Sequence, residues 1–182
     1  MLRSWRARHY DRDNPSGDGF FAPSSVNVLF VCEDNCSLGL MAESILATEA
    51  QGRFKAYSAG SSAGRGASRE VIDFLARHHM RIAGLQPKAL AQFRGRGAPV
   101  MDFIITLSDA GAAENFADWP GAPFVAHWNV LDEYAQDAAE SAYRDAFWTL
   151  WRRIKIFASL PHGTLNRRVL ERRAVTLQAN YL

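Results

Sequence analysis

The sequence is poor in cysteine and has no marked excess of either charge. Its 182 residues include only two cysteines, and 21 basic residues nearly balance 19 acidic ones. Two cysteines are too few for the disulfide framework of a small secreted protein, and they fit a reducing compartment. A formal net charge of +2 gives no strong attraction to nucleic acid. We therefore expect neither a disulfide scaffold nor a nucleic-acid-binding protein.

Long apolar runs are also lacking. No stretch is long enough to span a bilayer, and the N-terminus carries charges without the apolar core of a signal peptide. We expect a cytoplasmic protein with no membrane partner. Because 48% of the residues are apolar, the chain can bury a proper core, and its length favours one compact domain.

The chain is predicted to divide into three parts. Residues 1–25 are polar and interrupted by proline and glycine, which predicts a flexible N-terminal extension. Residues 26–160 form the predicted α/β domain. Residues 161–182 are expected to add a C-terminal helix and tail.

Apolar runs with the composition of strands alternate with segments of helical periodicity through the middle part. This alternation predicts a parallel sheet covered by helices on both faces, with ligands bound beyond the carboxyl ends of the strands. Strands are expected at 26–32, 54–60, 101–107 and 124–128, and helices at 40–50, 68–80, 88–93, 109–116 and 135–160.

Cys32 ends the first expected strand, just before a helix. A loop at such a point collects unpaired backbone N–H groups, and the helix dipole adds positive charge, so an oxyanion or a thiolate can be stabilised there. The alternative interpretation is a small apolar residue that finishes a buried strand. Neighbouring His78 and His79 point apart on a helix, and we predict neither a metal site nor a cofactor.

Five short segments occur in a characteristic order: VLFVCEDN, MAES, YSAG, DFIIT and HWNVLD. Together they resemble the low-molecular-weight protein tyrosine phosphatases and their arsenate-reductase relatives, over about residues 27–160. The resemblance implies a three-layer sandwich with a four-stranded parallel sheet and a phosphate-binding loop. It also implies a phosphate-like or arsenate-like oxyanion as ligand, with a phosphoprotein as a further candidate partner.

In that family the loop has the pattern C-x-x-x-x-x-R-S, in which the cysteine is the nucleophile, the arginine clamps the oxyanion and the serine supports the thiolate. Here Leu38 stands at the arginine position and Gly39 at the serine position. Loss of one preorganised donor to a developing oxyanion costs about 3 to 4 kcal/mol. Asn35 matches the family asparagine that braces the loop, although turns favour asparagine in any case. The predicted oxyanion loop comprises Glu33, Asp34, Asn35, Cys36, Ser37, Leu38 and Gly39.

Asp132 falls where the family carries its general acid, but Glu133 replaces the proline that usually follows. A buried carboxyl there could protonate a leaving oxygen. The competing interpretation is an ordinary surface or helix-capping aspartate.

The redox chemistry of the arsenate reductases needs further cysteines, which this chain lacks. Ser108 stands at the expected position of one of them, and Ser37 replaces the usual partner cysteine of the phosphatases. A disulfide between Cys32 and Cys36 stays an open alternative. We also consider that an arginine from a glycine-rich loop replaces the missing guanidinium, the candidates being Arg65, Arg94 and Arg96.

The sequence therefore leads to two main hypotheses, beside the alternative that the pocket is collapsed around Leu38 and the function lies elsewhere in the chain. The first is a phosphatase or arsenate reductase that uses Cys32 and Asp132, with activity that is weak or lost because Leu38 replaces the arginine. The second is a non-catalytic module, a pseudophosphatase, that recognises an anion or a partner protein.

Overall fold

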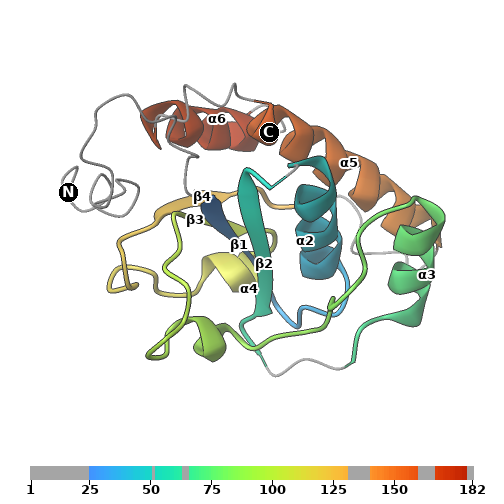
Figure 1. The fold of residues 1–182 in the computed structure, drawn as a ribbon, viewed down its shortest axis with the longest axis horizontal. Helices are drawn as coiled ribbons and strands as arrows, with labels where there is room; N and C mark the ends of the chain where they lie inside the picture. The colour runs from blue at the N-terminus through green and yellow to red at the C-terminus, as the bar shows by residue number, and fades with distance from the viewer. Residues whose placement is uncertain (1–24, 51, 63–65, 131–139, 160–166, 180–182) are drawn as a thin grey trace, which may run out of the picture.

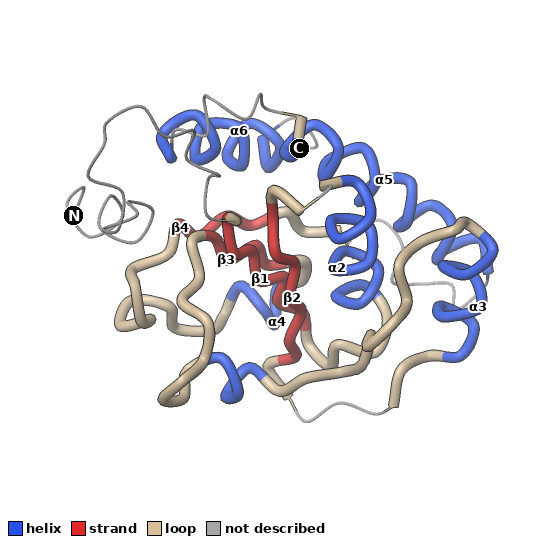
Figure 2. The backbone as a smooth tube through the Cα atoms, viewed as in Figure 1, coloured by secondary structure: helices blue, strands red, loops and turns tan. Residues whose placement is uncertain are grey.

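The computed structural model describes residues 25–50, 52–62, 66–130, 140–159 and 167–179. It contains one sheet of four parallel strands in the order β2-β1-β3-β4. The sheet lies at the centre of the molecule with helices on both sides (Figures 1 and 2). The predicted α/β three-layer architecture with a four-stranded parallel sheet is confirmed. The strands are β1 (Val26–Cys32), β2 (Phe54–Gly60), β3 (Phe103–Thr106) and β4 (Phe124–His127).

The helices connect the strands and extend beyond the last of them. They are α2 (Leu38–Glu49), α3 (Arg69–Arg77), the 3-10 helix η1 (Leu90–Phe93), α4 (Asp109–Ala112), α5 (Glu140–Ala158) and α6 (Arg167–Ala179). Among the described residues, no helix combines the length and the apolar content needed to cross a bilayer.

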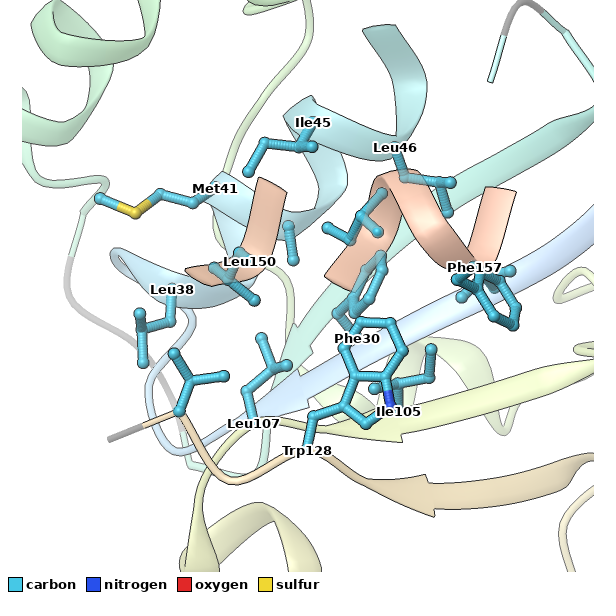
Figure 3. Close-up of a cluster of buried hydrophobic side chains, with 14 of the residues drawn as sticks. Phe30, Leu38, Met41, Ile45, Leu46, Ile105, Leu107, Trp128, Leu150 and Phe157 are labelled. Carbon is cyan, nitrogen blue, oxygen red and sulfur yellow. The ribbon is translucent and has the colours of Figure 1, made fainter. Parts of the chain in front are cut away.

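Strand β1 is buried on both faces, which explains its continuous apolar sequence. Phe30 belongs to a large cluster with residues of α2, α3, α5 and α6. Figure 3 shows Phe30 among the side chains of this cluster that come from α2 and α5. Leu29 and Val31 belong to a second cluster, with residues of η1 and of the loops near Met101 and Trp119. The alternation of side chains along β1 therefore joins the two halves of the core.

Some helix boundaries were predicted wrongly. The expected helix 109–116 stops at Ala112, and the Asn115 side chain then accepts a hydrogen bond from the Ala117 N–H, which favours a turn. The expected helix 68–80 ends at Arg77, since His79 has a φ of 56°. The expected helix 88–93 is a short 3-10 turn.

Helix α6 packs on the domain through its apolar side. Ala174 and Leu177 are buried in the large cluster, and the indole Nε1 of Trp128 donates to the Ala174 carbonyl at 3.2 Å. The helix lies within the predicted C-terminal segment, and it completes the cover over the β4 side of the sheet.

Candidate functional site

Strand β1 delivers Cys32 to its carboxyl end, where the loop to α2 begins. The segment after β2 holds this loop in place: the Ser61 N–H donates to the Cys32 carbonyl and the Ser62 N–H to the Glu33 carbonyl, both at 2.9 Å. Gly60 is required for this close approach, because a Cβ there would lie 2.8 Å from the backbone carbon of Asp34. The loop is thus fixed to its neighbour by backbone contacts.

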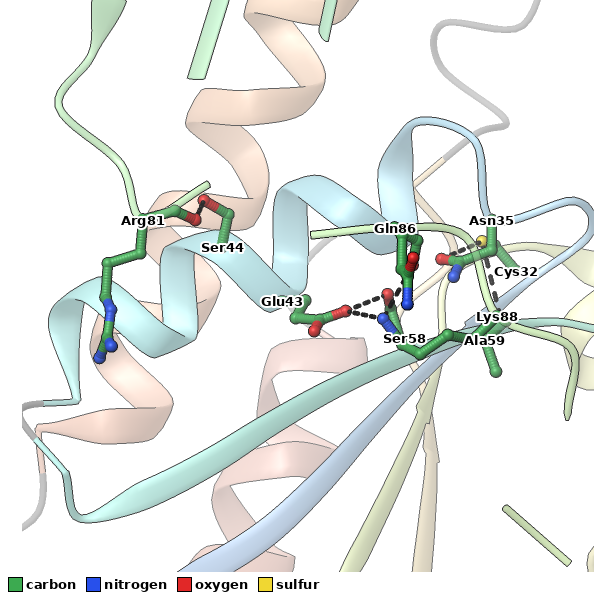
Figure 4. Close-up of polar contacts among 9 residues, drawn as sticks. All are labelled: Cys32, Asn35, Glu43, Ser44, Ser58, Ala59, Arg81, Gln86 and Lys88. Carbon is green, nitrogen blue, oxygen red and sulfur yellow. Dashed lines mark hydrogen bonds and ion pairs between the residues drawn. The ribbon is translucent and has the colours of Figure 1, made fainter. Parts of the chain in front are cut away.

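Asn35 lies at the centre of the loop. It is fully buried and has a φ of 54°, a left-handed conformation that asparagine tolerates better than most residues. The Cys32 thiol donates weakly to Asn35 Oδ1 and to the Ala59 carbonyl, with both sulfur–oxygen distances at 3.9 Å (Figure 4). The predicted bracing residue therefore contacts the predicted nucleophile directly.

Cys32 is only 4% exposed, and its environment favours the neutral thiol. Burial raises its pKa to about 12, an effect that the backbone N–H groups of Asn35 and Gly39 partly oppose. The negative charge of Asp34 adds to the rise. The backbone N–H groups of Asn35 and Gly39 thus favour the thiolate, as expected for a strand-to-helix anion loop, but their effect on the pKa is smaller than that of desolvation.

Asp34 and Cys36 interact within the loop. The Asp34 carboxylate accepts from the Cys36 N–H at 3.1 Å and from the Cys36 thiol at 2.9 Å. Partial burial, followed by this hydrogen bond, raises the pKa of Cys36. The Cys36 carbonyl in turn accepts from the Ser68 N–H at 3.0 Å, which ties the loop to the start of α3. Both cysteines are free thiols.

Leu38, at the position expected for an arginine, belongs to the hydrophobic core. It is 6% exposed and is part of the large cluster that also contains Met41, Leu107 and Leu150 (Figure 3). Ser37 precedes it and accepts the first helical hydrogen bond from the Met41 N–H through its carbonyl, without a side-chain cap. The start of α2 is therefore anchored by an apolar contact.

The remaining candidates are the general acid and the arginines considered as replacements for the missing guanidinium. Asp132 and Arg65 lie outside the described residues. Arg96 is exposed, and the Arg94 guanidinium donates to the Asn115 carbonyl at 2.7 Å and lies over the ring of Trp119. The contacts described for Arg94 are thus with the segment after α4.

Ser108 has a structural role in the described fold. Its hydroxyl caps the short helix α4 by accepting from the Gly111 N–H at 3.2 Å. Gly111 approaches the end of β1 so closely that a Cβ there would lie 2.8 Å from the Val31 carbonyl oxygen. The segment that lacks the expected cysteine therefore does pack beside Cys32.

A partly buried ion pair between α2 and the segment before η1 was not foreseen from the sequence. The Glu43 carboxylate accepts from the Ser58 hydroxyl and forms an ion pair with Lys88 at 2.9 Å (Figure 4). The Lys88 carbonyl also accepts from the Gly60 N–H at 2.8 Å. The MAES and YSAG segments could have indicated the contact between Glu43 and Ser58, which they contain. Nothing in the sequence indicated that Lys88 joins them.

A cavity of about 370 Å³ lies along the outer edge of β2, away from this loop. Its lining includes Glu43, Ser44, Tyr57 and Arg81, and no residue between 32 and 39. No group of three histidine, cysteine, aspartate or glutamate side chains suited to a metal ion occurs within the described part of the chain.

Comparisons with known proteins agree with the fold described above. A family model described as low molecular weight phosphotyrosine protein phosphatase matches residues 27–155. Comparison of the sequence with curated proteins gives no match.

Several solved structures share the fold at low sequence identity. The low molecular weight protein tyrosine phosphatase of T. tengcongensis aligns with a TM-score of 0.56 and 22% identity, over 75% of this chain and 100% of that one. Wzb of Vibrio vulnificus, in complex with benzylphosphonate, aligns with a TM-score of 0.51 and 18% identity, over 74% of this chain and 97% of that one. The thioredoxin-dependent arsenate reductase Cg_ArsC1' of Corynebacterium glutamicum aligns with a TM-score of 0.54 and 20% identity, over 74% of this chain but only 64% of that chain.

Proposed function

Because this chain belongs to the low molecular weight phosphotyrosine protein phosphatase family, we propose that it keeps a cysteine-based oxyanion loop but has weak or no phosphatase and arsenate-reductase activity. The observation that carries this proposal is the burial of Leu38 in the core, at the position where the resemblance implies the arginine. A leucine offers no hydrogen bond to an oxyanion.

The chemistry would require Cys32 to lose its proton and attack phosphorus or arsenic, while a carboxyl protonates the leaving oxygen. We assign the first role to Cys32 and the second to Asp132. Two features of the described loop oppose the attack. The raised pKa of Cys32 keeps the sulfur protonated near neutral pH, and the Asp34 carboxylate adds negative charge where a dianionic substrate would approach.

The expected penalty is large. Removal of one preorganised donor costs about 3 to 4 kcal/mol, which corresponds to a rate loss of several hundredfold. The raised pKa of Cys32 adds to this loss, because only the thiolate is a good nucleophile. We therefore place the activity near or below the limit of measurement.

A second candidate function is a non-catalytic module that binds an oxyanion or a phosphoprotein in the cytoplasm. It is favoured by the retained loop framework, in which the N–H groups of Asn35 and Gly39 still point to the Cys32 sulfur. An anion that displaces the Asp34 carboxylate from the Cys36 N–H would gain a further donor.

The deciding experiment compares the purified protein with its Cys32→Ser variant, using an aryl phosphate and, separately, arsenate with a thiol reductant. We expect no turnover, or turnover hundreds of times below that of an active relative assayed alongside, and lost in the variant. Turnover equal to that of the active relative would overturn the proposal.

Binding is measured on the same samples as the shift in thermal unfolding midpoint with phosphate and arsenate. A shift without turnover supports the non-catalytic module. Neither turnover nor a shift, with no phosphoprotein captured, would show that this loop is not an oxyanion site.

A further inference from the structure

The Asn35 side chain is buried beside Cys32 with only half of its polar groups satisfied. Its Oδ1 accepts from the Cys32 thiol at 3.9 Å, and the residue has no exposed surface. Its Nδ2 has no hydrogen-bond partner among the described residues. A buried amide donor without a partner carries a desolvation cost, so this one calls for a physical explanation.

Gly39 shows that the carboxamide fills the space between the sulfur and the start of α2. A Cβ at Gly39 would lie 2.1 Å from Asn35 Oδ1 and 2.9 Å from Cys32 Sγ. Glycine is therefore the residue that this position accepts while Asn35 keeps its place. The position of the Asn35 carboxamide therefore depends on the absence of a side chain at Gly39.

We propose that Asn35 is a two-state partner of the Cys32 sulfur, which accepts from the thiol through Oδ1 and donates to the thiolate through Nδ2 after a half-turn of its carboxamide. The oxygen and the nitrogen of a carboxamide have nearly the same size, and the torsion that exchanges them has two broad minima. The two orientations of the carboxamide therefore occupy nearly the same space. The only covalent change is the S–H bond, whose proton passes to solvent base.

None of the other groups described below around the Cys32 sulfur donates a side-chain hydrogen bond to a thiolate. Asp34 and Cys36 are the charged and titratable groups that oppose ionisation, and both belong to the loop. Strand β2 presents the Ala59 carbonyl, which is an acceptor. Gly111 of α4 lies against the backbone of Val31 and Cys32. A thiolate in this position would face the Asn35 oxygen unless the carboxamide turned. This inference goes beyond the proposed function, because it concerns ionisation of Cys32 whether or not any substrate is turned over.

The test uses a Cys36→Ser background, in which Cys32 is the single cysteine of the chain. Alkylation by iodoacetamide is followed against pH with Asn35 intact and in Asn35→Gly, a change that suits the positive φ. Loss of one charge-assisted hydrogen bond should lower the rate about tenfold or more at each pH below the plateau, and displace the profile to higher pH. Asn115→Gly is the matched control, since this exposed asparagine lies after α4.

The result that would overturn the proposal is a profile that is unchanged, or displaced to lower pH, in Asn35→Gly. If that variant does not fold, Gly39→Ala in the same background takes its place, because the added Cβ pushes the carboxamide away from the sulfur. It should displace the profile to higher pH, whereas Gly95→Ala, where a Cβ meets open space, should not. An unchanged profile in Gly39→Ala would equally overturn the proposal.

Discussion

Leu38 connects the proposed loss of activity with the stability of the fold, because it lies where the family resemblance implies an arginine and packs in the core. Truncation of a buried leucine removes apolar contacts and leaves a cavity, so Leu38→Ala should lower the free energy of unfolding by about 2 to 5 kcal/mol. Urea unfolding measures this loss. Ile82→Ala, at a residue that is 38% exposed, should change it far less. Equal effects at the two positions would contradict the packing described for Leu38.

Cys32 should make the stability of the protein depend on pH in the alkaline range. Its ordinary pKa of 9.0 applies to the unfolded chain, and burial raises the folded value to about 12. Between these values the unfolded chain has released the proton and the folded chain keeps it, so stability falls as pH rises, by about 1.4 kcal/mol per pH unit. Below pH 9 both the folded and the unfolded chain keep the Cys32 proton, so this thiol does not lower the stability there.

The matched variant for this prediction is Cys32→Ala, compared with the parent chain by denaturant unfolding at several pH values. Cys36 and Tyr57, whose pKa values burial also raises, stay in both proteins. The difference between the two curves therefore isolates Cys32. Parallel curves from pH 8 to 11 would show that this thiol is not protected by burial.

At the residue scale, sequence and family resemblance predicted the positions in the loop better than their contacts. The order of segments located Cys32 at the end of the first strand and Asn35 in the loop that follows, but Gly39, expected in that loop, lies in the first turn of α2. It did not reveal that Leu38 packs into the core, or that Asp34 accepts from Cys36, because such contacts depend on side-chain directions within a tightly packed loop.

At the scale of elements, an ion pair joins Glu43 on α2 to Lys88 before η1. The two side chains are 15% and 16% exposed and 2.9 Å apart. A double-mutant cycle with Glu43→Gln and Lys88→Met should give a coupling energy of about 1 to 3 kcal/mol, because each partner would leave the other poorly solvated.

The exposed pair Arg69–Asp73, 3.9 Å apart on α3, provides the comparison for that cycle. Its coupling should be close to zero, since water screens exposed charges. If the two cycles gave the same coupling, burial of the Glu43–Lys88 pair would have no energetic effect. The sequence could not predict this pair, because its members are 45 residues apart.

The elements themselves were predictable where their sequences are unambiguous. Strands β1 and β2 occupy the expected ranges 26–32 and 54–60. Strand β1 is a largely apolar run rich in β-branched residues, and β2 is a short segment that ends in small residues. Helix α4 is shorter than expected, since the turn at Asn115 competes with helical hydrogen bonding. Local side-chain bonds of this kind do not appear in a hydrophobic pattern.

For the whole molecule, α6 decides whether residues 26–160 form a sufficient domain. The family model ends at residue 155, yet Ala174 and Leu177 are buried in the same core as β1 and α5. We propose that the C-terminal segment is part of the folding unit. Leu177→Ala should then cost about 2 to 5 kcal/mol, whereas Val175→Ala, at a residue that is 50% exposed, should be nearly neutral.

A chain shortened to end before Arg167 tests the same point on a larger scale. Removal of α6 would uncover Trp128, which is 1% exposed and donates to the Ala174 carbonyl. Exposure of an indole and loss of its hydrogen-bond partner should lower the urea midpoint below that of Leu177→Ala. An unchanged midpoint would mean that the family domain is stable alone and that α6 only rests on it. A large decrease would show that the core of this chain extends beyond the region that the family model matches.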